Sequence, residues 1–331
     1  MIAAGPPGRV LVAGAGGFIG GHLTRALVAA GREVRGVDIK PLDAWYQHGA
    51  GVEEIVGDLA AREVSAAAVQ DIDVVYNLAS DMGGMGFIAT QKLACMLSVL
   101  INTHLVTAAA AAGASRYFYA SSACVYAEEH QNTTAGPALV EADAYPAMPE
   151  DGYGWEKLFS ERMCRHVSEE LGLETRVARY HNVYGPHGAW IGGREKAPAE
   201  IARKIATAEL TGEHEIEVWG DGHQTRSFTY IDDCLEGTLR VTAGEWRDPV
   251  NVGSSELVTI NQLVDLLADI AGISVSRRHD LSKPQGVRGR NSDNTLIQAR
   301  YGWEPTTTLR AGLTRAYAWI REQVAADLAR T

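Results

Sequence analysis

The sequence predicts an α/β fold, with a doubly wound parallel sheet and a smaller C-terminal domain. Two observations support this prediction. Short apolar runs alternate with helical patterns over the first half of the 331-residue chain, and this alternation is typical of parallel sheets. A glycine-rich turn directly follows the first apolar run, and polar residues follow several of the others. Ligands of doubly wound sheets bind at these strand ends.

Composition limits the class of protein. The net charge of −11 argues against nucleic acid or an anionic membrane as the main partner. We find no apolar run near the roughly 18 residues of a membrane span, and the N-terminal segment lacks a signal-peptide core. The four cysteines, Cys95, Cys124, Cys164 and Cys234, lack the CxxC spacing of a metal or redox site. We therefore expect a cytoplasmic protein without a bound metal.

The glycine-rich turn has the sequence GAGGFIG at residues 14–20, between a predicted strand at 9–13 and a helical pattern. Glycine permits the tight turn and lets backbone N–H groups reach a pyrophosphate at the helix N-terminus. A second predicted strand, residues 33–37, ends at Asp38, 18 residues after Gly20. A carboxylate there binds the adenosine ribose and disfavours the extra phosphate of NADP. The order of these features predicts a Rossmann-type domain that binds NAD.

The alternation continues along the chain. Further strands are predicted at residues 54–56, 73–79, 116–120 and 175–180. Ser80, Ser122 and His181 would lie at the ligand-binding edge of the sheet, and Asp58 could contact the adenine. The residues predicted to bind NAD are Gly14, Gly17, Phe18, Ile19, Gly20, Asp38, Asp58, Leu59, Leu78, Ala79, Ser80, Tyr153 and Lys157.

Tyr153 and Lys157 lie four residues apart, on one face of a helix that apolar residues at 159, 163, 167 and 171 predict. A lysine beside a phenol stabilises the phenolate and lowers the tyrosine's pKa from about 10. Such a tyrosine can take the proton of a substrate hydroxyl while hydride leaves the same carbon. Because a Tyr/Lys pair at this spacing is also common on solvated helix faces, the prediction depends on the surrounding motifs.

Together these motifs resemble the extended short-chain dehydrogenase/reductase superfamily and, more narrowly, its GDP-mannose 3,5-epimerases. The similarity extends from about residue 9 to residue 325. Its most specific segments are NLASDMGGMGFI at 77–88, YASSAC at 119–124, HNVYGP at 181–186, GGREKAP at 192–198, WGDG at 219–222, QTRSF at 224–228 and GVRGRNSDN at 286–294. The resemblance implies tightly bound NAD that is regenerated in each cycle. It also implies a homodimer through the helices at 96–112 and 153–171.

The implied reaction is redox-neutral epimerisation of a nucleotide sugar at C3 and C5, most simply GDP-mannose to GDP-L-galactose, GDP-L-gulose or both. Oxidation of the C4 hydroxyl to a ketone acidifies the C–H bonds on both sides, and inversion then needs a base and an acid on opposite faces. Cys124 and Lys196 are the predicted pair, with a neighbouring lysine to stabilise the thiolate. Tyr153, Lys157 and Ser122 are predicted to carry the oxidation at C4.

The substrate's diphosphate accounts for several basic and polar residues. Arg226 and Arg288 would contact phosphate or nucleotide through their guanidinium groups, and Arg290 competes with Arg288 for this role. Glu195 would hold a sugar hydroxyl or orient Lys196. The residues predicted to bind substrate are Gly83, Ser122, Ala123, Cys124, Asn182, Glu195, Lys196, Ala197, Lys204, Gln224, Arg226 and Arg288.

Two domains are predicted. Residues 9–181 and about 228–252 would bind NAD, and residues about 182–227 and 253–328 would bind the nucleotide sugar. Thr259 and Gln262 predict a capping box that opens a helix in the second domain.

Two other functions stay open. One is an NDP-hexose 4,6-dehydratase or C4-epimerase of the same superfamily. The absence of an Asp/Glu pair at positions 123 and 124 argues against the dehydratase. The other is a non-catalytic, NAD-binding regulatory protein, against which the intact set of catalytic side chains argues.

Overall fold

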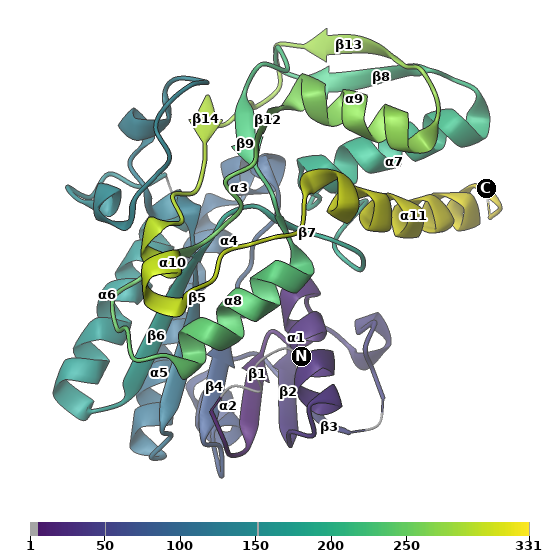
Figure 1. Cartoon of the computed structure of the whole chain (residues 1–331). Coiled ribbons are helices and arrows are strands. Elements are labelled where there is room, and N and C mark those ends of the chain that lie inside the picture. Colours follow the sequence, from purple (N-terminus) through teal and green to yellow (C-terminus); the bar gives the residue numbers. More distant parts are fainter. Residues whose placement is uncertain (1–5, 50, 151, 331) are drawn as a thin grey trace.

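The computed structural model describes residues 6–49, 51–150 and 152–330 (Figure 1). Its largest feature is a seven-stranded sheet of order β11-β6-β5-β4-β1-β2-β3, in which all neighbouring strands are parallel. The predicted α/β fold is confirmed. The strands are β1 Val10–Ala13, β2 Val34–Asp38, β3 Val52–Val56, β4 Val74–Asn77, β5 Arg116–Ser122, β6 Glu174–Tyr180 and β11 Val250–Val252.

Helices pack on both faces of this sheet, because each strand turns alternate side chains to opposite faces. Val10 and Val12 of β1 belong to one buried cluster, together with Leu23 of α1. Leu11 of β1 belongs to a second cluster, together with Leu105 of α5. The helices of this part are α1 Phe18–Ala29, α2 Arg62–Ala68, α3 Met85–Thr90, α4 Lys92–Leu97, α5 Val99–Ala111, α6 Tyr153–Leu171 and α8 Ile231–Ala243.

The remaining elements gather beyond the ligand-binding edge of the sheet, where α7, α9, β8, β13 and α11 lie together (Figure 1). They form three small sheets, β10-β7, β12-β9-β14 and β13-β8. The strands are β7 Val183–Tyr184, β8 Glu215–Trp219, β9 Thr225–Ser227, β10 Thr229–Tyr230, β12 Leu257–Thr259, β13 Ser276–Asp280 and β14 Gly289–Arg290. The helices of this part are α7 Ala197–Thr211, α9 Ile260–Ala271 and α11 Leu309–Leu328, whereas α10 Thr295–Tyr301 packs against β11 of the large sheet. Short 3-10 helices occur at Leu42–Ala44, Ala123–Val125, Glu128–Gln131 and Glu141–Ala144.

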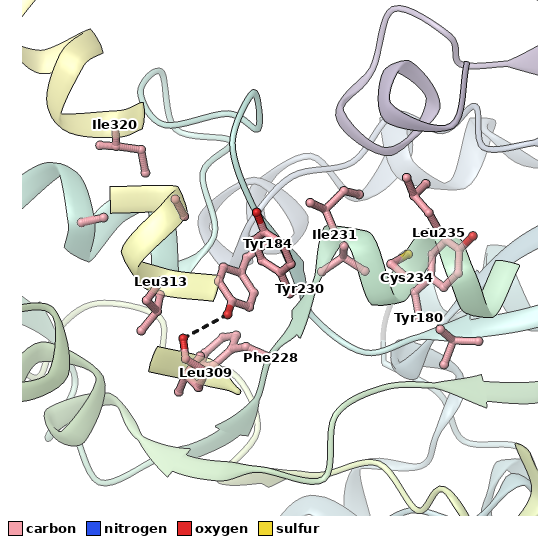
Figure 2. Packing of buried hydrophobic residues seen from close by; sticks show 14 of the residues in the cluster. Tyr180, Tyr184, Phe228, Tyr230, Ile231, Cys234, Leu235, Leu309, Leu313 and Ile320 are labelled. Carbon is pink, nitrogen blue, oxygen red and sulfur yellow. Dashed lines mark hydrogen bonds between the residues drawn. The ribbon is translucent and has the colours of Figure 1, made fainter. Parts of the chain in front are cut away.

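One apolar cluster joins the two parts, since it includes residues of β1 and α1 as well as residues of α7, α9 and α11. Figure 2 shows the junction, where Tyr184 and Phe228 lie beside Leu309 at the start of α11. The hydroxyl of Tyr184 donates a hydrogen bond to the carbonyl of Leu309 over 3.3 Å. Because the core is continuous across both parts, it marks no boundary between two domains. The predicted domain boundaries therefore stay predictions.

One helical stretch, Lys92–Ala111, is long and apolar enough to cross a membrane by length and composition, with a mean hydropathy of 1.7. The expectation that no apolar run is long enough was therefore wrong. The stretch forms α4 and α5, and α5 packs against α2 and α6. A helix that packs on a sheet passes the same test, so one such stretch is weak evidence for a membrane span.

Candidate active site

The glycine-rich turn forms a narrow cradle at the end of β1. Gly14 has a φ of +84°, and a Cβ there would lie 2.9 Å from the backbone nitrogen of Ala79. A Cβ at Gly20 would overlap the carbonyl oxygen of Gly14. Gly17 is the N-cap of α1 and leaves the start of that helix without a side-chain cap. The close backbone approach and the uncapped helix start, where Phe18 and Ile19 lie, suit a pyrophosphate.

Asp38 and Ser80 extend this cradle along the sheet edge. Asp38 ends β2, is 8% exposed, and accepts a hydrogen bond from the backbone nitrogen of Lys40 over 3.0 Å. The Ser80 hydroxyl, which follows β4, is buried and has no hydrogen-bond partner among the described residues. An unpartnered buried hydroxyl costs free energy unless a ligand satisfies it. These residues therefore fit NAD, and their individual roles stay predictions.

The other residues predicted to bind NAD surround the same edge. Leu78 and Ala79 follow β4 and are half-buried. Leu59 is buried, whereas Asp58 is exposed and accepts a hydrogen bond from the backbone nitrogen of Ala60 over 2.9 Å. Asp58 thus caps its own turn, and its contact with the adenine stays a prediction.

A loop that sequence reasoning missed covers the glycine-rich turn. Trp45 is buried and donates from its indole to the carbonyl of Lys40 over 3.0 Å. Tyr46 donates its hydroxyl to the carbonyl of Phe18 over 3.2 Å, and the Gln47 amide donates to the carbonyl of Ala15. This loop holds the cradle in shape. The only signal for it in the sequence is a cluster of large polar and aromatic residues after strand β2.

Tyr153 is the first residue of α6, 5% exposed, and lies beside Ser122 at the end of β5. Burial raises the pKa of the Tyr153 phenol well above its ordinary value, while a hydrogen bond with Ser122 acts in the opposite direction. The Nζ atom of Lys157 lies 5.3 Å from the centroid of the Tyr153 ring. The expectation that the phenol's pKa is lowered was therefore wrong for the protein alone, because burial raises it.

Lys157 is buried and makes contacts that the sequence did not predict. Its Nζ atom donates to the hydroxyl of Tyr119 over 3.2 Å and lies 3.3 Å from Oε2 of Glu156. The lysine predicted to be catalytic thus has a carboxylate partner beside it on the same helix.

Cys124 lies in the 3-10 helix that directly follows β5, next to Ala123, and is 6% exposed. Its Sγ atom accepts a hydrogen bond from Nη1 of Arg290 over 3.5 Å. Arg290 is itself buried, donates to Oε1 of Gln131 over 2.6 Å, and forms an ion pair with Glu150. The cation beside the thiol is therefore an arginine, whereas the sequence suggested a lysine. Arg290 lies at the thiol and is not free to hold a diphosphate.

Lys196 stands at the N-cap of α7 and is half-buried. Burial lowers its pKa, and the electrostatic influence of Cys124 acts in the opposite direction, so the two groups lie within electrostatic reach. The loop that carries Lys196 is attached to the loop after β4. The backbone nitrogen of Gly84 donates to the carbonyl of Arg194 over 3.0 Å, and Nη1 of Arg194 lies 2.6 Å from Oδ1 of Asp81. These contacts hold the loop of Lys196 against the loop after β4, and the catalytic role of Lys196 stays a prediction.

Gly83 and Gly84 allow this close approach. A Cβ at Gly83 would lie 2.8 Å from the Cβ of Phe87 and 3.2 Å from the Cα of Arg194. A Cβ at Gly84 would overlap the carbonyl oxygen of Glu195. The glycine-rich segment after β4 therefore packs against the Lys196 loop.

Arg226 has an unusual set of partners. Its guanidinium donates to the carbonyls of Thr225 over 2.7 Å and Val287 over 2.6 Å, and within the described part of the chain no carboxylate pairs with it. Burial lowers its pKa to about 10. Nearby, the Gln224 amide donates to the carbonyl of Trp219 over 3.1 Å, while its buried Oε1 atom has no partner in the residues described. Both side chains keep unsatisfied capacity for a ligand.

Other residues predicted to bind substrate are engaged within the protein. Both terminal nitrogens of Arg288 donate to the Asp221 carboxylate, over 3.1 and 3.0 Å. Nζ of Lys204 donates to Glu200 over 2.5 Å and to the carbonyl of Glu217 over 2.8 Å.

Glu195 and Asn182 also have partners inside the fold. Glu195 accepts from the backbone nitrogen of Gly193 over 2.7 Å and so closes its own loop, two residues before Ala197 at the start of α7. Asn182 has a φ of +41° and donates from its amide to the carbonyl of Ser227 over 3.1 Å. The roles predicted for these residues in substrate binding stay predictions.

The four cysteines are all buried free thiols. Burial raises the pKa of Cys164 and of Cys234 to about 12. Cys95 packs in one small cluster with Cys124 and Tyr153, so it adjoins the site although the sequence gave no reason to place it there. In the described ranges, no group of three or more His, Cys, Asp or Glu residues could hold a metal ion.

Known proteins of similar sequence identify the family of this chain. The sequence profile of the NAD dependent epimerase/dehydratase family matches residues 10–253. GDP-mannose 3,5-epimerase 1 of Oryza sativa subsp. indica is 44% identical to this chain, over 96% of this chain and 82% of its own length. The structure of MoeE5 in complex with UDP-glucuronic acid and NAD has a TM-score of 0.80 and 30% identity, and the match covers 96% of this chain and 100% of that one. UDP-glucose 4-epimerase of Thermotoga maritima, with a TM-score of 0.84 at 22% identity over 96% of this chain and 99% of its own, shares the fold. The chain belongs to the NAD dependent epimerase/dehydratase family, within the extended short-chain dehydrogenase/reductase superfamily that its motifs indicate.

Proposed function

We propose that this protein epimerises a nucleotide sugar at C3 and C5 through a 4-keto intermediate. GDP-mannose is the proposed substrate, with GDP-L-galactose, GDP-L-gulose or both as products, as the name of the rice relative suggests. The observation that carries the proposal is the Cys124 thiol, which lies in one cluster with Tyr153 and beside the guanidinium of Arg290. A thiol held beside a cation is suited to proton abstraction.

Each proposed proton transfer is assigned to a residue of this chain. NAD, when bound, accepts hydride from C4 and returns it at the end of the cycle, so that no cofactor is consumed. Tyr153, hydrogen-bonded to Ser122, takes the proton of the C4 hydroxyl and later gives it back. The ketone acidifies the hydrogens at C3 and C5. Cys124 and Lys196 then remove and deliver these protons on opposite faces of the ring.

The local chemistry suits the acid and the base. Arg290 stabilises negative charge on the Cys124 sulfur, because its guanidinium donates a charge-assisted hydrogen bond to it. Burial lowers the pKa of Lys196, so its ammonium gives up a proton more readily than an exposed lysine would. The two groups therefore offer a base and an acid to a carbon acid.

Arg226 is the proposed ligand of the substrate's diphosphate. A buried cation that has only carbonyl partners gains from an anionic ligand. Arg288 is already paired with the Asp221 carboxylate, and Arg290 with Glu150 and the Cys124 thiol. Of these three arginines, Arg226 is therefore the one whose positive charge is not paired with a carboxylate.

The 4,6-dehydratase alternative needs a free carboxylic acid near C5 and C6. The structure shows Ala123 and Cys124 in the loop after β5. Glu150 lies against this loop, where its backbone nitrogen donates to the carbonyl of Cys124 over 3.2 Å, but its carboxylate is paired with Arg290. No specific contact thus favours dehydration.

The decisive experiment is incubation with GDP-mannose in D2O, followed by NMR of the sugar. We expect deuterium at C5 and C3, together with new signals of the epimers. Cys124→Ala should abolish exchange at carbon while bound NAD is retained. A product without the C6 oxygen, or inversion at C4 alone, would show one of the alternative functions instead. A chain that binds NAD but exchanges no deuterium would be the regulatory protein.

We further propose a homodimer through α4, α5 and α6. Helices α5 and α6 pack side by side. The cleft between them is lined by Thr107, Phe159, Met163, Val167 and Leu171, together with Arg162, His166 and Glu170. Large apolar side chains gather on this surface, and such patches mark interaction sites. The exposed ones are Leu93, Met96, Leu97, Leu100, Trp155, Phe159 and Leu171.

Light scattering of the purified protein tests the dimer. Phe159→Glu should give a monomer, because it buries a charge in the proposed interface. Leu281→Glu is the matched control, since Leu281 is 69% exposed on a different part of the chain. A wild-type monomer, or a Phe159→Glu variant that stays dimeric, would remove this proposal.

We also propose the cytoplasm as the location. The four cysteines are free, as in proteins of reducing compartments. Imaging of a fluorescent fusion in the host cell tests this, and accumulation in any other compartment would contradict it.

A further inference from the structure

Glu156 forms a closed polar cluster behind the proposed catalytic tyrosine. It lies between Tyr153 and Lys157 on α6, and its side chain is 1% exposed. Oε1 accepts hydrogen bonds from the hydroxyls of Tyr119 over 3.0 Å and Ser160 over 3.1 Å. Oε2 lies 3.3 Å from Nζ of Lys157 and is buried, with no hydrogen-bond partner in the described part of the chain. The charge of Lys157 is thus the main compensation for this oxygen.

We propose that Glu156 is a positioning residue, which holds the Lys157 ammonium against Tyr119 and offsets part of its positive charge at the Tyr153 phenol. The geometry supports both the positioning of the Lys157 ammonium and the partial compensation of its charge. Tyr119 bridges the pair, since its hydroxyl donates to Glu156 and accepts from Lys157 over 3.2 Å. The same Nζ atom lies 5.3 Å from the centroid of the Tyr153 ring, close enough for its charge to act on the phenol.

Partial compensation of the Lys157 charge by Glu156 suits a redox-neutral cycle, and in this respect the inference rests on the proposed function. Tyr153 must take a proton from the C4 hydroxyl and later return it to the same oxygen. A phenol that is too acidic returns the proton poorly, and one that is too basic takes it poorly. A carboxylate beside the lysine sets the balance between these two demands, and Glu156 adds to the effects that raise the pKa of Tyr153.

The test is Glu156→Gln, which keeps an acceptor for Tyr119 and Ser160 but removes the charge. Tyr153 is observed directly by NMR of protein with 13C at the tyrosine Cζ, in the NAD-bound enzyme, and Tyr153→Phe assigns its signal. We expect the titration midpoint of Tyr153 to fall by on the order of one pH unit. The acidic limb of the kcat profile should move the same way, with KM for the sugar unchanged within about twofold.

Two controls accompany this variant. Glu213→Gln makes the same chemical change at an exposed site and should leave the midpoint in place. Tyr119→Phe removes the bridge but neither charge, so kcat should fall severalfold at nearly constant KM, and it serves as the test if the Gln variant does not fold. An unchanged kcat in that variant would contradict the positioning role.

If Glu156→Gln leaves the titration midpoint of Tyr153 unchanged and lowers only the melting temperature, then Glu156 has a merely structural role. A midpoint that rises would mean that Lys157 loses its proton without Glu156, which also overturns the proposed offset. The NMR titration does not depend on epimerase activity. Failure of this inference is therefore distinguishable from failure of the proposed function.

Discussion

Nη1 of Arg290 donates a hydrogen bond to Sγ of Cys124 over 3.5 Å, between residues that are 166 positions apart in the chain. Gln131 and Glu150 hold the guanidinium in place. The thiol proposed as a base therefore has a fixed cation beside it, supplied by the short strand β14.

Arg290→Gln should make the Cys124 thiolate less stable relative to the thiol, because the substitution removes the positive charge beside the sulfur. We expect the pH midpoint of iodoacetamide alkylation at Cys124 to move upward and deuterium exchange at C5 to fall by roughly ten- to a hundredfold. Alkylation is followed by mass spectrometry of the peptide that contains Cys124. Arg288→Gln is the matched control, since Arg288 pairs with Asp221 instead of the thiol. Equal alkylation profiles for both variants would contradict this role of Arg290.

Arg226→Gln should weaken substrate binding. Loss of a charge-assisted contact to a diphosphate costs about 1.5–3 kcal/mol, which corresponds to roughly a ten- to a hundredfold weaker affinity for GDP by calorimetry. Arg310→Gln, at an exposed ion pair with Asp269, serves as the control. GDP affinity that is the same in both variants would exclude Arg226 as the diphosphate ligand.

Lys196→Met should make the protein more stable at pH 7, although it abolishes exchange at carbon. Burial lowers the pKa of Lys196 in the folded state, so the folded protein binds this proton less strongly than the unfolded chain does. The resulting penalty is fully present below the folded pKa and disappears as the pH rises through the unfolded pKa of about 10.4. Thermal melts from pH 6 to pH 11 should show a gain in Tm that shrinks at high pH. A loss of stability at pH 7 would contradict the effect of burial.

Gly84→Ala should displace the loop that carries Lys196. A Cβ at this position overlaps the carbonyl oxygen of Glu195, so we expect exchange at C3 and C5 to fall at least about tenfold, because misplaced catalytic groups are costly. Reduction of bound NAD by the sugar, followed by absorbance, should persist.

Gly86→Ala is the control for this change, because its Cβ would lie 3.4 Å from the Trp219 ring, which is an ordinary contact distance. If both alanine variants keep full exchange, the packing of these two loops does not position Lys196.

Much of the fold followed from local rules. The glycine-rich turn, Asp38 at the end of β2 and the capping box at Thr259 were predicted from short segments. The structure confirms each in place, with Thr259 Oγ1 accepting from the backbone nitrogen of Gln262 over 3.0 Å. Such features depend on backbone conformations and hydrogen bonds within a few residues, and nearby residues encode them directly.

The partners of the charged groups did not follow from local rules. The sequence offered Arg288 and Arg290 as equivalent candidates for the diphosphate, but one binds Asp221 and the other lies at Cys124. Similarly, the spacing of Tyr153 and Lys157 predicted a direct effect of the lysine on the phenol. The structure adds two partners of the lysine that the spacing does not reveal, Glu156 and Tyr119.

The sequence by itself determined that the chain builds a parallel sheet with a dinucleotide cradle. It also indicated the thiol of Cys124, the amine of Lys196 and the phenol of Tyr153 as candidate catalytic groups. Periodicity and turn chemistry are properties of neighbouring residues, so one chain suffices to predict them. Only the tertiary structure decided which cation faces which anion. Ion pairing depends on distances between residues far apart in the chain and on burial, which strengthens the interaction of charges that water would otherwise screen.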